Sequence, residues 1–228
     1  MEDETVYHDL EPEVHQKIAG VVSGATPILD MGCGEGRLTN FLAAKLNSEI
    51  YGIDISGFNL TEAQEAAEAQ GISHLVQYVK GDASKLHFLD KSFAAVVILY
   101  SLHEIENPKK ALKEVWRVLK VKGKLIVADF IKGGKAEELW GERYYTPREI
   151  ETMLHEVGFG EMATGFIYDD IVLVSSRKVS TERINELERR ITELKIRIPP
   201  HSIPPHMLEE LDNLEEELQR LEEIEEPI

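Results

Sequence analysis

Glycines and acids cluster in one short segment near the start of the chain, which reads Ile28-Leu-Asp-Met-Gly-Cys-Gly-Glu-Gly-Arg37. The apolar start followed by glycines predicts a strand that ends in a tight turn and leads into a helix. Glycines at such a turn let a ligand approach the backbone closely, and the helix N-terminus behind them supplies free N–H groups. Gly32 and Gly34 are therefore candidate ligand-binding residues.

The acid before this turn narrows the kind of ligand. A dinucleotide fingerprint would read G-x-G-x-x-G/A, whereas these glycines are each two residues apart and Arg37 occupies the position that should be small. Asp30 is unhelpful for a pyrophosphate but well suited to a cation. The segment resembles motif I of class I S-adenosylmethionine-dependent methyltransferases, whose cofactor carries an ammonium and a sulfonium but no phosphate.

This resemblance implies roles for residues at the ends of the next strands. Asp54 lies at the end of the second strand, in Tyr51-Gly-Ile-Asp-Ile55. Its carboxylate would accept hydrogen bonds from the ribose hydroxyls, next to Ile55. Asp82 follows the third strand, where the acid and the neighbouring N–H group of Ala83 would bind the adenine edge. Ser101 leaves the fourth strand beside the cofactor. The succession of motifs over about residues 10 to 177 is similar to the branch that contains the ubiquinone- and menaquinone-type methyltransferases.

His103 is the candidate catalytic residue, in the segment Tyr100-Ser-Leu-His-Glu104. Its unperturbed pKa suits a general base at neutral pH. A structural role at the strand exit is the alternative. Trp140, Tyr144 and Tyr145 follow a Gly-Gly pair, and they would either fold over the pocket as a lid or pack beneath their own loop.

Short apolar runs alternate with helical stretches up to about residue 178, which predicts an α/β fold with a Rossmann-like, doubly wound sheet. The first five predicted strands are parallel, and two final strands separated by Asp169 and Asp170 add an antiparallel pair at the sheet edge. The predicted strands are Pro27–Met31, Glu49–Ile55, Val76–Lys80, Phe93–Tyr100, Lys124–Phe130, Glu161–Tyr168 and Ile171–Ser176. The predicted helices include Gly36–Leu46, Asn59–Gln70 and Pro108–Lys120.

Residues 179–228 form a second unit with a different composition, without glycine and rich in Glu, Leu and Ile. Apolar residues recur at alternating spacings of three and four, which is the pattern of a coiled-coil seam. A Pro-rich segment separates two such stretches, so we expect a coiled-coil helical hairpin with arms at about 180–198 and 206–226. The seam residues are Ile184, Leu187, Ile191, Leu194 and Ile198, then Met207, Leu211, Leu214, Leu218 and Leu221.

Charge and composition exclude several classes of partner. The formal net charge of −17 makes a basic face for a nucleic-acid backbone improbable. The apolar run at Ala94–Tyr100 is far shorter than the roughly 20 residues of a membrane span. Cys33 is the only cysteine, which excludes an intrachain disulfide and favours a cytoplasmic location. We expect no metal site, because His201 and His206 have no cysteine near them.

These features predict an enzyme that transfers a methyl group from S-adenosylmethionine to a small molecule or a protein side chain. The activated methyl needs only an acceptor held in line, so acid–base assistance is optional. The alternative is a cofactor-binding scaffold with little catalysis that acts through its hairpin. A hairpin with one apolar seam needs another surface to cover it, either in a homodimer or on a different protein.

Overall fold

The computed structural model describes residues 2–178, 181–198 and 204–225, and it contains one mixed seven-stranded sheet in the order β3-β2-β1-β4-β5-β7-β6. Strands β1 to β5 run parallel to one another, and β7 is antiparallel to both β5 and β6. The strands are β1 (Ile28–Met31), β2 (Ile50–Asp54), β3 (Val76–Lys80), β4 (Phe93–Leu99), β5 (Leu119–Phe130), β6 (Phe159–Ile167) and β7 (Ile171–Lys178). This arrangement confirms the predicted fold class.

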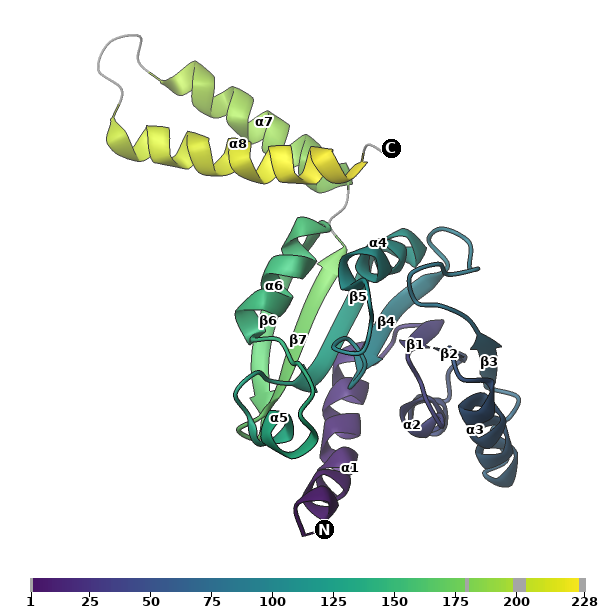
Figure 1. Cartoon of the computed structure of the whole chain (residues 1–228). Coiled ribbons are helices and arrows are strands. Elements are labelled where there is room, and N and C mark those ends of the chain that lie inside the picture. Colours follow the sequence, from purple (N-terminus) through teal and green to yellow (C-terminus); the bar gives the residue numbers. More distant parts are fainter. Residues whose placement is uncertain (1, 179–180, 199–203, 226–228) are drawn as a thin grey trace.

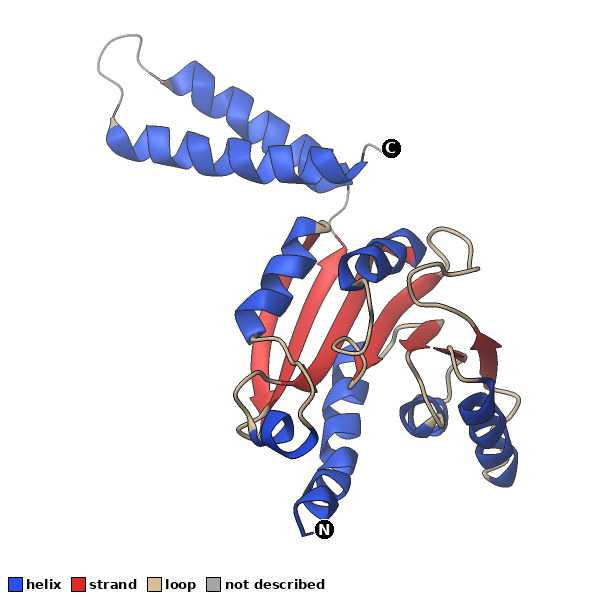
Figure 2. Ribbon diagram, in the orientation of Figure 1, coloured by secondary structure: helices blue, strands red, loops and turns tan. Residues whose placement is uncertain are grey.

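Helices cover both faces of the sheet (Figures 1 and 2). The covering helices are α1 (Glu2–Val22), α2 (Arg37–Leu46), α3 (Gly57–Ala69), α4 (Pro108–Val118), α5 (Lys135–Trp140) and α6 (Pro147–Glu156). The helices α7 (Thr181–Arg197) and α8 (Pro205–Glu225) follow and lie beyond the end of β7 (Figure 1). No helix in the described ranges combines the length and apolar character needed to cross a membrane.

Side chains of the central strands alternate between two apolar cores, as the two-residue period of a strand requires. Leu29 and Met31 of β1 lie in the core beneath α4 and α6. Ile28 of the same strand lies in the core beneath α1 and α2. Covering both faces explains why the parallel strands are almost continuously apolar.

The junction between α4 and β5 differs from the prediction. Asn107 caps α4 by accepting a hydrogen bond from the Lys110 N–H group at 3.0 Å, and Pro108 is the first helical residue. The helix ends at Val118, two residues earlier than expected, and β5 begins at once at Leu119. The strand bends at Lys122, which has a φ of 61°, so the apolar stretch from residue 124 is only its second part.

Lys178 ends β7 and joins it to α4, although its side chain is a buried ammonium with 4% exposure for the residue. Nζ donates hydrogen bonds to the carbonyl oxygens of Trp116 at 2.7 Å and Leu119 at 3.0 Å, and it lies 3.7 Å from the centroid of the Trp116 ring. Carbonyl groups at a helix C-terminus attract a cation. The last residue of the sheet is thereby tied to the end of a covering helix.

The two C-terminal helices occupy the predicted arms within one or two residues. Leu187, Ile191 and Leu194 of α7 pack against Leu214 of α8, and these are four of the predicted seam residues. Lys195 and Glu215 form an ion pair between the arms at 2.6 Å. Figure 1 shows the hairpin beyond the end of β7, while a coiled coil in the strict sense stays a prediction.

Candidate functional site

The glycine-rich turn connects β1 to α2 with backbone conformations that favour glycine. Gly32 and Gly36 have φ values of 75° and 73°, in the left-handed region. A Cβ atom on Gly32 would lie 2.6 Å from the Ser101 hydroxyl oxygen, whereas one on Gly34 would meet nothing within 4 Å. The turn is therefore packed on one side and open on the other.

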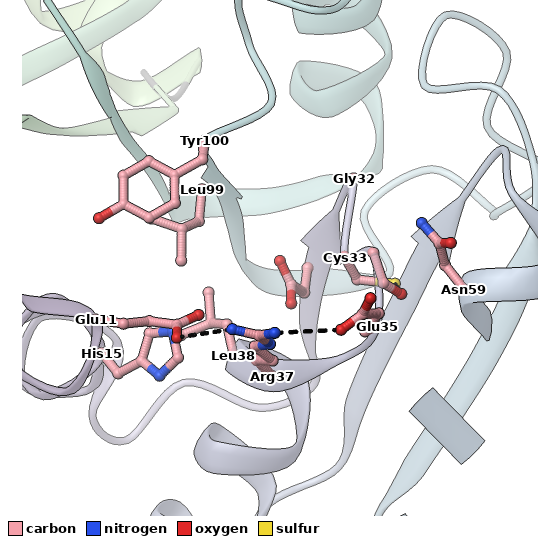
Figure 3. Close-up of a pocket in the computed structure, with 12 residues that line it drawn as sticks. Glu11, His15, Gly32, Cys33, Glu35, Arg37, Leu38, Asn59, Leu99 and Tyr100 are labelled. Atoms are coloured by element: carbon pink, nitrogen blue, oxygen red, sulfur yellow. Dashed lines mark hydrogen bonds and ion pairs between the residues drawn. The ribbon is translucent and has the colours of Figure 1, made fainter. Parts of the chain in front are cut away.

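The open side of the turn forms part of a pocket of about 320 Å³. Its walls come from α1, the turn, the start of α2 and the end of β4 (Figure 3). This is the carboxyl edge of the parallel strands, where ligands bind in open α/β sheets. The lining residues are Glu11, His15, Asp30, Gly32, Cys33, Gly34, Glu35, Arg37, Leu38, Asn59, Leu99 and Tyr100.

Asp30 is a buried carboxyl group in the wall of this pocket, with 1% exposure. Thr39 donates a hydrogen bond to its Oδ2 atom at 2.6 Å. Burial raises the pKa of Asp30 to about 7, and the negative charge of Asp54 acts in the same direction. A cationic ligand in the pocket would favour the ionised form of Asp30.

Asp54 is fixed by two backbone N–H groups at the end of β2. Oδ2 accepts a hydrogen bond from Gly34 at 2.9 Å, and Oδ1 accepts one from Ser56 at 2.8 Å. A carboxylate has about four acceptor positions, so two stay available for hydroxyl groups of a ligand. Ile55, the next residue, is 73% exposed and offers an apolar surface beside this acid.

Asp82 lies two residues after the end of β3, the strand next to β2 in the sheet. Its Oδ1 atom accepts a hydrogen bond from the Ser84 N–H group at 2.7 Å, and this bond lowers the pKa of Asp82. The Gly81 N–H group donates to the Asp54 carbonyl oxygen at 2.9 Å, which places the two strand ends side by side. Ala83 packs against the core rather than standing free.

Ser101 is buried beneath the glycine turn. Its hydroxyl donates a hydrogen bond to the Met31 carbonyl oxygen at 3.0 Å and so ties the end of β4 to the end of β1. This contact uses the hydroxyl proton within the protein. The role of Ser101 in cofactor binding therefore stays a prediction, and the described contact is structural.

His103 lies between two carboxylates. Its Nδ1 atom is 2.8 Å from Asp129 Oδ1, and its Nε2 atom is 3.1 Å from Glu142 Oε2. Burial opposes the charged imidazole, but the hydrogen bond with Asp129 and the surrounding carboxylates outweigh it and raise the pKa of His103. An imidazole held in one orientation by an acid is suited to proton transfer.

The sequence reasoning missed Asp129 and Glu142. Asp129 is the second-last residue of β5 and is 2% exposed, and its position at a strand end was the available signal. Glu142 follows α5, and no pattern in the sequence indicated that this loop returns to His103. Tyr144 also lies here, buried with its ring 4.5 Å from that of His103 and its hydroxyl donating to Glu142.

The aromatic segment after β5 packs beneath its own loop. The ring of Trp140 lies edge-on to Phe130 at 5.2 Å, and the ring of Tyr144 contacts Phe130 at 5.6 Å. Tyr100 stacks on the other side of Phe130 at 4.6 Å. This arrangement matches the second of the two interpretations of these side chains, in which they pack rather than form a lid.

Helix α1 contributes Glu11 and His15 to the pocket wall, and the sequence did not reveal either residue. Arg37 forms ion pairs with Glu11 at 3.2 Å and Glu35 at 3.4 Å. The Nε2 atom of His15 is buried without a hydrogen-bond partner among the described residues, 3.8 Å from Glu11 Oε1. A buried polar atom in a pocket wall that lacks a partner is a candidate contact for a ligand.

Comparison with known proteins finds a match for part of the chain. A family model described as a methyltransferase domain matches residues 29–127, from β1 through most of β5. This stretch contains the glycine turn, Asp54, Asp82 and His103. Residues 29–127 are a methyltransferase domain.

Two curated relatives of the methyltransferase domain illustrate the range. One is a 2-phytyl-1,4-naphtoquinone methyltransferase of Trichormus variabilis, 28% identical over 156 residues, which are 68% of this chain and 68% of that protein. Another is a ubiquinone/menaquinone biosynthesis C-methyltransferase of Ectopseudomonas mendocina, 34% identical over 118 residues, or 50% of this chain and 46% of the relative. The chain thus spans less than half of the length of some of its relatives.

Solved structures with the same fold include a SAM-dependent methyltransferase from Aquifex aeolicus, with a TM-score of 0.62 and 24% identity over 74% of this chain and 89% of that one. The [4+2]-cyclase SpnF has a TM-score of 0.65 and 23% identity, and the match covers 73% of this chain and 80% of the cyclase. At this identity the likeness shows the fold of the methyltransferase domain, and the reaction has to be argued from the site.

Proposed function

We propose that the chain is an S-adenosylmethionine-dependent methyltransferase acting on a small molecule or a protein side chain. The observation that carries this proposal is the glycine turn between two carboxylates. Asp30 is buried in the pocket wall on one side, and Asp54 holds the Gly34 N–H group on the other. An acidic pocket with an open backbone turn suits a cationic ligand that contains a ribose.

The chemistry of the donor groups fits this cofactor along its whole length. Asp30, in the pocket lining, would face the ammonium group, and Asp54 has acceptor positions left for ribose hydroxyls. The exposed side chain of Ile55 and the acid Asp82 would contact the adenine ring and its edge. Gly32, Gly34, Ala83 and Ser101 complete the proposed binding residues.

His15 and Arg37 would complete the methionine end of the pocket. The unpartnered Nε2 atom of His15 and the guanidinium of Arg37 both belong to the pocket lining. Each can donate a hydrogen bond to a carboxylate, which the cofactor carries beside its ammonium.

When bound, S-adenosylmethionine supplies a methyl group that is already activated by a positively charged sulfur atom. The chain then has to orient the cofactor, position the acceptor and exclude water. His103 is the proposed catalytic residue, because Asp129 Oδ1 lies 2.8 Å from Nδ1 and fixes the imidazole, and a proton taken from an acceptor at Nε2 would be shared with Glu142 Oε2 at 3.1 Å. The names of the relatives, which include quinone and sterol methyltransferases, support a small-molecule acceptor.

The proposal is tested in two steps with the full-length protein. Isothermal titration with S-adenosylmethionine should give one binding site, and incubation with methyl-labelled cofactor and fractionated cell extract should label one class of acceptor. Absence of cofactor binding would refute the proposal. Binding without label transfer to any fraction would favour the scaffold alternative, which the comparisons do not support.

We also propose that the chain forms a homo-oligomer through its C-terminal hairpin. We further propose that it has no nucleic-acid partner and that it works in the cytoplasm. Two apolar side chains of the hairpin support the first proposal, since Ile196 and Leu208 are exposed. Fractionation of the source cells would test the location.

A further inference from the structure

The end of the sheet beside the pocket holds a group of three potential metal ligands. His103, Glu104 and Glu142 each offer one nitrogen or oxygen atom, and these atoms all lie within 4.8 Å of one another. His103 and Glu104 follow β4, whereas Glu142 comes from the loop after α5. The fold therefore brings together groups that are far apart in the sequence.

Asp129 fixes the orientation of the His103 ring on the Nδ1 side. Asp129 Oδ1 lies 2.8 Å from Nδ1, and the same oxygen atom accepts a hydrogen bond from the Phe130 N–H group at 2.9 Å. A neutral imidazole in this setting carries its proton on Nδ1 and directs the Nε2 lone pair away from Asp129. Histidines that bind metal ions commonly donate their other nitrogen to a carboxylate in this way.

The contact between Nε2 and Glu142 needs a positive charge. Nε2 lies 3.1 Å from Glu142 Oε2, and a lone pair facing a carboxylate at this distance would be repelled. Either a proton on Nε2 or a cation between the two groups removes the repulsion.

Glu104 adds to the negative charge at this place. Its ligand oxygen lies within 4.8 Å of the ligand atoms of His103 and Glu142, and Asp129 Oδ1 lies 2.8 Å from His103 Nδ1. Three carboxylates thus surround one histidine, and a divalent ion would balance them better than one proton.

We propose that His103, Glu104 and Glu142 bind one divalent transition-metal ion, with Zn²⁺ and Mn²⁺ as the fitting species. One imidazole and two carboxylates suit these ions better than Mg²⁺, which prefers oxygen ligands and retained waters. Three protein ligands leave a coordination position open, as in catalytic rather than structural zinc sites.

The role of the ion rests on the proposed function. An ion at this site would take the place of the proton on Nε2, so that His103 would act as a ligand of the ion and no longer as a base. The open position on the ion would hold an acceptor oxygen or nitrogen. The bound ion lowers the pKa of such a group, so that its proton leaves to solvent before the methyl group arrives. His103 and Glu104 closely follow Tyr100, which lines the pocket at the end of β4, so the ion would lie at the same carboxyl edge of the sheet as the cofactor.

The test is isothermal titration of the full-length protein with Zn²⁺ alone and with Mn²⁺ alone, after EDTA treatment and removal of the chelator. We expect one ion per chain, with Zn²⁺ bound more tightly than Mn²⁺. The double variant Glu104→Gln/Glu142→Gln and the variant His103→Ala should each weaken Zn²⁺ binding at least about a hundredfold. Asp129→Asn should weaken it about 10–100-fold, because Asp129 acts through His103.

Glu106→Gln is the matched control, since Glu106 is an exposed acid three residues from His103. It should bind Zn²⁺ as the unaltered protein does. Thermal unfolding of each variant checks that the fold persists. The double variant replaces two exposed side chains, so it should fold even if His103→Ala is unstable, and it then tests the metal site by itself. Unchanged Zn²⁺ affinity in the double variant, or no binding at all, would overturn the proposal.

Failure of the metal-site proposal can be distinguished from failure of the methyltransferase proposal. Titration with S-adenosylmethionine in the presence of EDTA reports on the cofactor site alone. Cofactor binding without metal binding would refute only the metal site.

Discussion

Asp54 links the glycine turn to the end of β2 through its hydrogen bonds with the backbone of Gly34 and Ser56. Replacing Asp54 with alanine removes the acceptors proposed for the ribose. We expect S-adenosylmethionine binding to weaken at least about tenfold, or about 1.4 kcal/mol, as for the loss of a hydrogen bond to a charged group. Isothermal titration measures the change.

Asp169→Ala is the control for this variant, because Asp169 is an exposed acid in the turn between β6 and β7. It should leave the affinity unaltered. Equal affinities in Asp54→Ala and the unaltered protein would remove Asp54 from the site.

Asp30 gives cofactor binding a dependence on pH. Burial raises the pKa of Asp30 to about 7, so the carboxyl group is largely protonated at pH 6 in the free protein. A cationic cofactor favours the ionised form, and binding at pH 6 should therefore release a proton and strengthen as the pH rises toward 8. Titrations in two buffers with different ionisation enthalpies measure this proton, and Asp30→Asn should abolish it.

The raised pKa of Asp30 also affects the stability of the fold, which falls as the pH rises, whereas cofactor binding strengthens. The pKa in the folded chain lies above the ordinary value, about 3.9 for an unfolded aspartate. The contribution of Asp30 to stability is therefore complete at low pH and is lost as the pH rises from about 4 to about 7. Asp30→Asn should flatten this part of the stability profile in urea unfolding.

Residues at strand ends could be predicted from the sequence, and residues that meet through loops could not. Asp30 and Asp54 each follow an apolar run directly, so their place at the carboxyl edge follows from the strand pattern. The meeting of Glu142 with His103 depends on the path of the chain after α5, which no periodicity records. His15 could not be predicted as a pocket residue for a similar reason, because its place in the pocket wall depends on how α1 packs against α2.

Among the elements, the turn between β1 and α2 is the most constrained. Gly36 has a φ of 73°, and a Cβ atom there would lie 2.7 Å from the Ala63 Cβ atom of α3. We expect Gly36→Ala to lower the free energy of unfolding by at least about 1–3 kcal/mol, from backbone strain alone before the clash is added. Urea unfolding followed by circular dichroism measures this loss.

Gly165→Ala provides the matched control in strand β6. A Cβ atom at Gly165 meets nothing within 4 Å, and the residue has no left-handed φ. Its free energy of unfolding should be unchanged or raised by up to about 1 kcal/mol. An equal loss in both variants would mean that the turn is not the source of the effect.

The strands were predictable because the central ones are apolar on both faces, while the ends of elements depended on local detail. Helix α6 was not anticipated, although Thr146 and Glu149 form a capping box at its start. The boundary at Val118 was also missed, since Leu119 and Lys120 continue the helical pattern of α4 in the sequence. Their place in β5 comes from pairing with β4, where Leu119 lies opposite Phe93.

At the scale of the whole molecule, the hairpin of α7 and α8 is the feature that distinguishes the chain from a methyltransferase domain alone. We expect a chain ended at Ser180 to keep its fold and its cofactor affinity, because it retains Lys178 and the whole sheet. Its mass by light scattering should fall to that of a monomer, whereas the full chain should be a dimer. The same oligomeric state for both chains would refute self-association through the hairpin.

A chain that ends at Arg177 tests how much Lys178 contributes to the stability of the fold. Removing Lys178 leaves the carbonyl groups of Trp116 and Leu119 without their buried ammonium partner. This shorter chain should unfold at lower urea concentration than the one ended at Ser180. Equal stability would show that Lys178 contributes little to the sheet.

The attachment of the hairpin to β7 also has a mechanical consequence. Strand β7 lies between β5 and β6, and both neighbours are antiparallel to it. A pull on the hairpin along the axis of β7 would load both ladders of hydrogen bonds in shear, where many bonds resist together. A hairpin attached to the edge strand β6 could instead be peeled away one bond at a time. The fold thus anchors its appendage where tension from a bound partner does least damage to the site.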